Sequence, residues 1–204
     1  MSRARAPYII VLGPDGSGKT TLADALAQLL IEEGLLARRL NFSFGFMPPL
    51  SQLLGRSRPS SSREGEPLVG MVKPLSSAHA MILACWYGFD HLLGHFRLRS
   101  REKNAVYIFA RSYHDFLYQR AYMKLPAFVP KLFLALGPKP DLVAAPWREP
   151  DIIHAQKPEL TVQEISDQYR RLAEGLEWEP NFIEIDASAG IEATVKQLRG
   201  RLAL

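Results

Sequence analysis

Gly13-Pro-Asp-Gly-Ser-Gly-Lys-Thr20 decides the fold, because this stretch matches the pattern G-x-x-x-x-G-K-[ST] without a gap. It follows Tyr8–Leu12, a short apolar run rich in β-branched residues that is typical of a strand buried on both faces. After it, apolar residues recur at helical spacing as far as Gly34, which is expected to end the helix. A strand, a glycine-rich turn and an amphipathic helix in this order predict a phosphate-binding loop, or P-loop.

The chemistry of phosphate binding explains the residue types in this loop. Glycines let backbone N–H groups turn toward phosphate oxygens without a Cβ in the way, and the following helix points its positive end at the same anion. Lys19 is expected to meet the β and γ phosphates of ATP, and the Thr20 hydroxyl to ligate Mg²⁺. The residues assigned to nucleotide binding are Gly13, Asp15, Gly16, Ser17, Gly18, Lys19, Thr20 and Thr21.

Composition excludes several other classes of protein. The chain has 204 residues, of which 47% are apolar and 23% charged, as expected for one ordinary globular domain. The net charge is +4, but the basic residues are spread along the sequence, which argues against a nucleic-acid-binding stripe. A single cysteine, Cys85, excludes an internal disulfide framework and a cysteine-rich zinc site. No apolar run approaches the length of a membrane span, and none follows Met1–Pro7 as a signal peptide would require, so we expect a cytoplasmic protein.

Strands and helices alternate along the rest of the chain. Further strands are predicted at Ala37–Phe42, Ala105–Phe109, Asp141–Ala145 and Phe182–Asp186. Helices are predicted at about 78–99, His114–Met123, Phe128–Leu136, from the capping box Thr161–Glu164 to about 177, and at Ile191–Leu202. This order predicts an α/β fold in three layers, with helices on both faces of a doubly wound parallel sheet. Residues at about 55–74 are rich in Ser, Gly, Pro and charged residues near their start, which predicts a mobile loop.

The extended run Gly13–Leu22 resembles the P-loop of the thymidylate kinase family. Stretches similar to the same family follow in the same order at Arg111–Tyr113, Pro140–Val143, His154–Thr161 and Phe182–Ser188. The variety that the chain most resembles is the thymidylate kinase-like proteins associated with bacterial surface polysaccharides. The resemblance implies the nucleoside monophosphate kinase type of P-loop NTPase fold, as one kinase domain over residues 1–204 with a short lid at about 148–161. It also allows a homodimer through the long helix.

The resemblance further implies roles at the site. Asp15 would face the sugar of the acceptor, and Arg111 its phosphate. Gly16 is similar to the family style in which the lid, and not the P-loop, supplies the catalytic cation. The candidates for that cation are Lys157, Arg148, or the pair Arg170 and Arg171. The residues assigned to catalysis are Lys19, Arg111, Lys157 and Arg148.

One departure from the family concerns Mg²⁺. Ala110 stands directly before Arg111, where the family has an aspartate that helps to hold the water shell of the metal ion. Asp115, one helical turn further on, is the candidate substitute.

Other departures concern the acceptor and the lid. Asn41–Gly45 replaces the Arg-Glu-Pro-Gly stretch with which the family holds the acceptor phosphate, and His91 stands near an expected arginine of the long helix. Gln156 occupies a lid position where arginine is expected. Pro146 falls where the fourth strand should continue, and proline cannot donate to a central ladder.

Three functions remain open at this point. The leading one is an enzyme that moves the γ-phosphate of ATP to a small phosphate-bearing acceptor, above all a nucleoside monophosphate, with dTMP a poor substrate. The second is a nucleotide-binding protein that has lost turnover and acts as a switch or scaffold, which Ala110 and Gln156 favour. The third is a kinase of a sugar or another non-nucleotide acceptor.

Overall fold

The computed structural model describes residues 5–50, 74–99 and 104–202, and these contain a five-stranded sheet in the order β2-β3-β1-β4-β5. All four neighbouring pairs of strands are parallel. The strands are β1 (Tyr8–Val11), β2 (Leu36–Leu40), β3 (Ala105–Phe109), β4 (Leu142–Trp147) and β5 (Phe182–Asp186). The predicted parallel sheet is therefore confirmed, and β1, which leads into the P-loop, lies at its centre.

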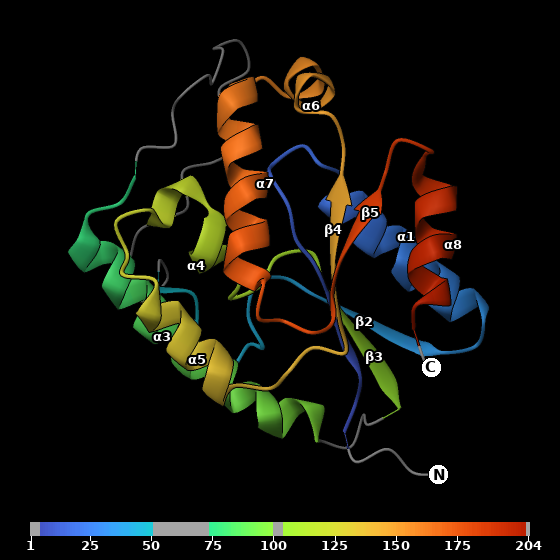
Figure 1. Ribbon diagram of the computed structural model, residues 1–204. Coiled ribbons are helices and arrows are strands. Elements are labelled where there is room, and N and C mark those ends of the chain that lie inside the picture. The colour runs from blue at the N-terminus through green and yellow to red at the C-terminus, as the bar shows by residue number, and fades with distance from the viewer. Residues whose placement is uncertain (1–4, 51–73, 100–103, 203–204) are drawn as a thin grey trace.

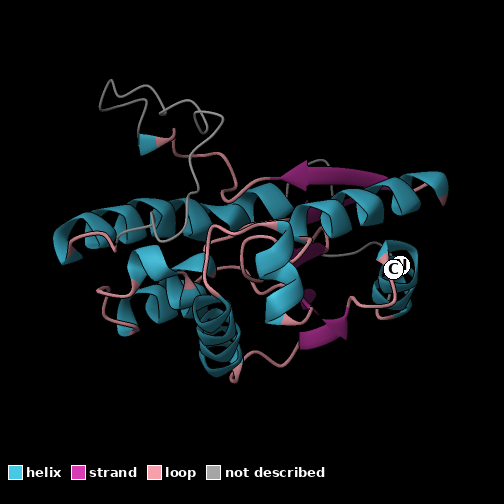
Figure 2. Cartoon of the chain, turned by 90° about the horizontal axis from the view of Figure 1, so that it is seen from above, coloured by secondary structure: helices cyan, strands magenta, loops and turns pink. Residues whose placement is uncertain are grey.

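Helices cover both faces of the sheet (Figures 1 and 2). One face carries α1 (Lys19–Glu32) and α8 (Ile191–Gly200), which pack on each other. The opposite side carries α3 (Ser77–Leu98), α4 (Asp115–Tyr118), the 3₁₀ turn η1 (Arg120–Tyr122), α5 (Phe128–Leu136) and α7 (Val162–Leu176). The short helix α6 (Pro150–Gln156) packs on α7 beyond the carboxyl end of β4. This is the three-layer, doubly wound arrangement that the sequence predicted.

The side chains of β1 alternate between two buried clusters, because successive residues of a strand point to opposite faces. Ile9 and Val11 pack against α1 and α8, whereas Ile10 and Leu12 pack in the cluster that includes residues of α3, α4 and α7. All four side chains are fully buried. The wholly apolar run of β1 is therefore explained by its position between two helical layers.

The predicted helix at His114–Met123 is wrong, because the segment breaks into α4 and η1. The backbone of Gln119 is extended at the break, and the carbonyl of Ala121 accepts a hydrogen bond from the N–H of Leu75 at 2.9 Å. This hydrogen bond ties the turn after the break to the segment before α3, so a tertiary contact accompanies the departure from the local pattern.

Pro146 does not interrupt β4, contrary to the expectation from the sequence. Ala144 bonds toward β1, where its carbonyl accepts from the N–H of Leu12 at 2.9 Å. Pro146 lies two residues after Ala144, so its backbone groups point toward the same neighbouring position in the sheet. At that level β1 has already ended and the chain has entered the P-loop. The missing N–H therefore costs no ladder bond, and the carbonyl of Pro146 accepts from the hydroxyl of Tyr169 at 3.0 Å.

The remaining elements follow the sequence closely. Ser76 caps α3, and Thr161 and Glu164 form the predicted capping box at the start of α7. No helix among the described residues is long and apolar enough to cross a membrane. The mobile loop predicted at about 55–74 lies, except for its last residue, outside the described residues.

Candidate functional site

The P-loop leaves the carboxyl end of β1 at the centre of the sheet, where open α/β sheets bind their ligands. Gly16 has a φ of 92°, and a Cβ built on it would lie 2.9 Å from Cγ2 of Ile153 and 3.4 Å from Cβ of Lys157. Ile153 belongs to α6, and Lys157 is the C-cap residue of that helix. The predicted lid therefore packs directly on the P-loop, in space that only a glycine leaves free.

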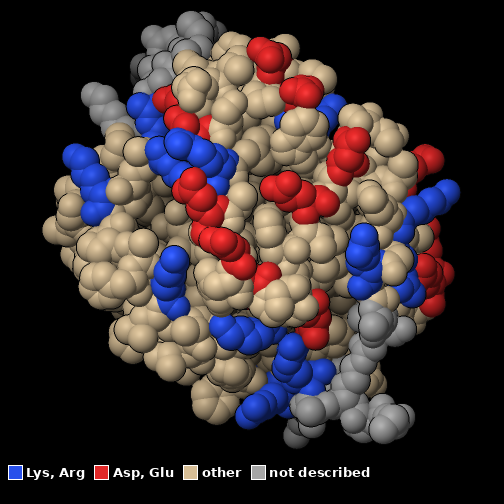
Figure 3. Space-filling view, viewed as in Figure 1, with Lys and Arg blue, Asp and Glu red and all other residues tan. Residues whose placement is uncertain are grey.

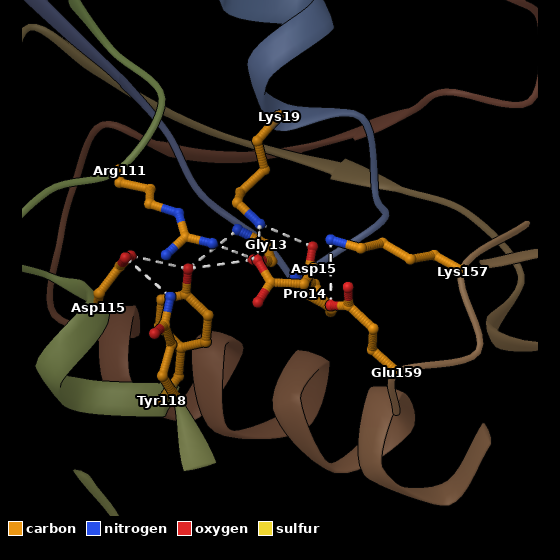
Figure 4. A network of polar contacts seen from close by, with 10 residues as sticks. Gly13, Pro14, Asp15, Lys19, Arg111, Asp115, Tyr118, Lys157 and Glu159 are labelled. Atoms are coloured by element: carbon orange, nitrogen blue, oxygen red, sulfur yellow. Dashed lines mark hydrogen bonds and ion pairs between the residues drawn. The ribbon is translucent and has the colours of Figure 1, made fainter. Parts of the chain in front are cut away.

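Lys19 is folded back onto the loop, with its side chain 5% exposed. Its Nζ donates to the carbonyl of Pro14 at 2.8 Å and to Oδ1 of Asp15 at 3.1 Å. Nη2 of Arg111 lies 2.7 Å from the same carboxylate oxygen (Figure 4). One carboxylate thus joins the two cations that the sequence assigned to the donor and acceptor phosphates.

The charges of this group perturb one another. Burial alone would raise the pKa of Asp15, but Lys19, Arg111 and Lys157 together lower it below its usual value. Burial lowers the pKa of Lys19, and Asp15 partly restores it. Three cations thus share one carboxylate at the mouth of the P-loop, and cations placed this close together suit a phosphate.

Asp115 reaches the P-loop indirectly. Its Oδ1 accepts from the hydroxyl of Tyr118 at 2.9 Å, and its Oδ2 from Nε2 of Gln119 at 2.8 Å. The Tyr118 hydroxyl in turn lies 3.2 Å from both the backbone N and the backbone O of Gly13 (Figure 4). Burial raises the pKa of Asp115 to about 6, although Lys19 and Arg111 act in the opposite direction. No pattern in the sequence predicts this contact, because it depends on the packing of α4 against the loop.

A cavity of about 380 Å³ opens beside the start of α1, and Ala110 forms part of its wall. The described residues that line it are Thr20, Asp24, Arg39, Leu40, Asn41, Ala110 and Arg111. Thr20 is exposed there, so its hydroxyl oxygen fits a Mg²⁺ ion that is bound mainly through nucleotide phosphates and water. No group of three or more His, Cys, Asp or Glu side chains able to hold a metal occurs among the described residues.

The four lid cations occupy different places. Lys157 lies beside Asp15 and pairs with Glu159 at 3.1 Å (Figure 4). Nη1 of Arg148 donates to Oε1 of Gln156 at 3.1 Å, so the glutamine that replaces an expected arginine orients another arginine.

Arg148 also lines a second cavity, of about 210 Å³, on the other side of the P-loop. The described lining consists of Ser17, Gly18, Thr21, Leu22, Pro146, Arg148, Ala187, Gly190, Ile191 and Thr194. Arg170 instead pairs with Asp167, and Arg171 lines a separate cavity next to Tyr118 and Tyr122. Among these four cations, Lys157 is the one that lies beside Asp15.

The segment after β2 is held by a buried aspartate to which the sequence had assigned no role. Asp90 of α3 accepts hydrogen bonds from the backbone N–H groups of Phe44, Phe46 and Met47 at 2.5, 2.7 and 2.9 Å. An acid within an otherwise apolar helix was the signal that could have identified it. The segment after β2 is therefore fixed by a carboxylate of α3.

His91 is also buried, stacked on Tyr113 with ring centroids 5.4 Å apart, and burial lowers its pKa to about 3. A neutral imidazole in this position adds no charge to the acceptor side. It cannot replace the positive charge of the arginine that the family resemblance led us to expect near this position.

Comparisons with known proteins identify the fold. No family model matches the chain, and no curated protein matches it by sequence. Thymidylate kinase from Candida albicans superposes with a TM-score of 0.63 at 18% identity, covering 97% of this chain and 91% of that one. The chain thus has a thymidylate kinase-like fold, which confirms the resemblance at the level of architecture. At this identity the likeness establishes the fold alone.

The contact between Gly16 and α6 can be tested against Gly18, which has a similar φ of 88° but no atom within 4 Å of a built Cβ. Both Gly16→Ala and Gly18→Ala carry the strain of a left-handed backbone, about 1–2 kcal/mol. We expect Gly16→Ala to lose about 1–3 kcal/mol more in urea unfolding, because its Cβ overpacks Ile153. When both glycine variants are compared in an Ile153→Ala background, most of that excess should disappear. Equal losses for the two glycines in the wild-type background would contradict the contact.

The raised pKa of Asp115 predicts a pH dependence of stability. The folded protein binds this proton more tightly than the unfolded chain, so the stabilisation is present below about pH 4 and lost as the pH rises through about 6. The free energy of unfolding of the wild type, relative to Asp115→Asn, should fall by about 3 kcal/mol between pH 4 and pH 7. Denaturant titrations of both proteins across this range measure it; a difference that does not change with pH would refute the shift.

Proposed function

We propose that this chain is an ATP-dependent phosphotransferase that acts in the cytoplasm on a small phosphate-bearing acceptor, most readily a nucleoside monophosphate. The observation that carries this proposal is the meeting of Lys19, Arg111 and Lys157 around Asp15 at the mouth of a P-loop. The first cation suits the phosphates of the donor, the second those of the acceptor, and the third comes from the lid. An arrangement that only bound nucleotide would not need all three.

In this mechanism the backbone of the P-loop and Lys19 hold the β and γ phosphates. The adjacent cavity lined by Arg148 and Thr194 is available to the rest of the nucleotide. A bound Mg²⁺, held on the protein by Thr20, would neutralise phosphate charge when present. Arg111 orients the acceptor phosphate.

An oxygen of that phosphate forms a bond to the γ-phosphorus as the bond from the γ-phosphorus to the β,γ-bridging oxygen breaks, and ADP leaves with the electron pair. The protein contributes position and charge, which are the main sources of catalysis in phosphoryl transfer. Lys157 is proposed to stabilise the charge on the γ-oxygens from the lid side.

The distribution of charged side chains on the surface agrees with ATP and a small phosphorylated acceptor as ligands. On the face drawn in Figure 3, acidic side chains lie among the basic ones, which supports a small anionic ligand rather than a nucleic acid.

We also propose a homodimer through α3 and α5. Ile82, Phe89 and Phe96 recur every seven residues on α3, and each is more than half exposed. Phe128, Leu132 and Leu136 add to them on α5, which packs on α3. Such a contiguous stripe is typical of a protein interface. Sedimentation should give a dimer for the wild type and a monomer for Phe89→Glu; a wild-type monomer would exclude it.

Two features support the alternative functions. Ala110 supplies no carboxylate near Thr20, which favours nucleotide binding without turnover. The segment after β2 lacks the family's arginine and is fixed by Asp90, which favours an acceptor other than a nucleotide, such as a sugar.

Lys19→Ala tests the donor site. We expect this variant to lose ATP binding in calorimetry, because the ammonium group is removed. Since Lys19 is buried against Asp15, we also expect unfolding at lower denaturant, but still in one cooperative transition. Lys196→Ala, an exposed lysine of α8, is the matched control and should bind like the wild type. ATP affinity that survives Lys19→Ala would exclude this P-loop as the binding site.

Turnover tests the choice between the three functions. We expect ADP release in the presence of Mg²⁺, ATP and one member of a panel of nucleoside monophosphates, with little or none for dTMP. Binding without turnover would instead support the switch, and turnover only with sugars the third function. Robust turnover of dTMP at about 1–100 s⁻¹ would refute our view of the acceptor side.

Ala110→Asp tests whether a missing carboxylate limits Mg²⁺ binding at this site. If the Mg²⁺ site beside Thr20 lacks only the carboxylate that the family has at the position of Ala110, the variant should raise turnover, or lower the Mg²⁺ needed, with an upper bound of about 10²–10³-fold. A wild type already fast at low Mg²⁺ would show that another carboxylate does this work. Loss of stability without any gain would mean that an unpaired charge has been buried.

A further inference from the structure

The cavity beside Thr20 contains a second arginine that neither the sequence nor the fold assigned to a role. Arg39 belongs to β2, one residue before its end, and Arg111 follows β3 by two residues. The two strands are neighbours in register, with Arg39 opposite Ile108 and Leu40 opposite Phe109. Both guanidinium groups therefore stand at the carboxyl edge of the sheet and line the same cavity.

Arg39 is held in place more firmly than an ordinary surface arginine. Its Nε lies 2.7 Å from Oδ1 of Asp24, and its Nη1 donates to the carbonyls of Leu40 and Ile108 at 2.9 and 3.2 Å. The hydrogen bonds of Arg39 to described residues all involve Nε and Nη1. The Nη2 group is thus a fixed donor that remains available on a side chain facing the cavity.

The balance of charge in the cavity favours an anion. Among the described residues, its charged lining is Arg39, Arg111 and Asp24, and Asp24 is engaged by Nε of Arg39. Arg111 contacts Asp15 through Nη2. Its Nε and Nη1 groups have no hydrogen-bond partner among the described residues. Asn41 adds an amide at the same edge of the sheet. The Nη2 group of Arg39, the remaining N–H groups of Arg111 and the amide of Asn41 can donate to the oxygens of a phosphate group.

We propose that Arg39 and Arg111 together bind the phosphate of the acceptor in this cavity. Arg39 then supplies the second cation that the segment after β2 lacks, from a position within the strand. Thr20 lines the same cavity, so a phosphate between the two arginines would lie next to the γ-phosphate of a nucleotide in the P-loop, as transfer requires. The proposal rests on the proposed phosphotransferase function and specifies its acceptor as a phosphate ester.

The test uses inorganic phosphate as the probe, titrated by calorimetry into protein saturated with Mg²⁺ and an imido analogue of ATP. The analogue fills the γ-phosphate position, so phosphate that binds must occupy a different place. We expect the wild type to bind phosphate and Arg39→Gln to bind it about 10–100-fold more weakly, the usual effect of losing hydrogen bonds from a charged group.

Matched variants separate binding from folding. Arg38→Gln removes the same charge from the opposite face of β2 and should leave phosphate affinity within about twofold. Arg39→Lys keeps the charge without the fork and should give an intermediate affinity. Both positions are checked by thermal unfolding, and the affinity for the ATP analogue should be unchanged in all three variants.

Three results would overturn the proposal. They are no phosphate binding by the analogue-saturated wild type, equal phosphate affinity in Arg39→Gln, or a loss of affinity in Arg39→Gln for the ATP analogue but not for ADP. The last result would assign Arg39 to the donor γ-phosphate. If the analogue itself does not bind, the proposed function fails separately, and phosphate titration of the unloaded variants still decides whether Arg39 holds an anion.

Discussion

The ion pair between Lys19 and Asp15 is the interaction on which the site depends. An ammonium group that is 5% exposed loses most of its hydration, and such a loss must be offset by a nearby anion or by carbonyl oxygens. Asp15 and the carbonyl of Pro14 provide both from within the loop itself. Because the same carboxylate also accepts from Arg111, the segments that follow β1 and β3 are joined across the site.

The position of the lid follows from where two strands end. β1 leaves the sheet after Val11, whereas β4 continues to Trp147 and pairs to its end with β5. This extra length carries α6 out over the loop, where its residues meet Gly16. Pro146 looks damaging to a strand in the sequence. It lies in the part of β4 that no longer pairs with β1, so its missing N–H breaks no hydrogen bond of the sheet.

How much the sequence predicts depends on whether a signal is local. The P-loop, the alternation of strands with helices and the capping box at Thr161 are encoded by residues that lie next to one another, and all were predicted. The roles of Asp90, Tyr118 and Arg39 depend on elements that are remote in sequence. Asp90 holds a segment more than forty residues away, and Tyr118 contacts Gly13 across the sheet. Such contacts produce no periodic pattern or fixed spacing in the sequence, so they could be found only in the folded chain.

The site is charged but internally compensated. Asp15 accompanies Lys19 and Arg111, Asp24 accompanies Arg39, and Glu159 accompanies Lys157. Each carboxylate keeps a cation oriented and limits the cost of its burial, while carrying a single negative charge. A phosphate group carries close to two charges at neutral pH and more acceptor oxygens, so it competes well for the same donors. Under the proposed function, the carboxylates hold the cations in place for phosphates, and the higher charge of a phosphate would favour its displacing them.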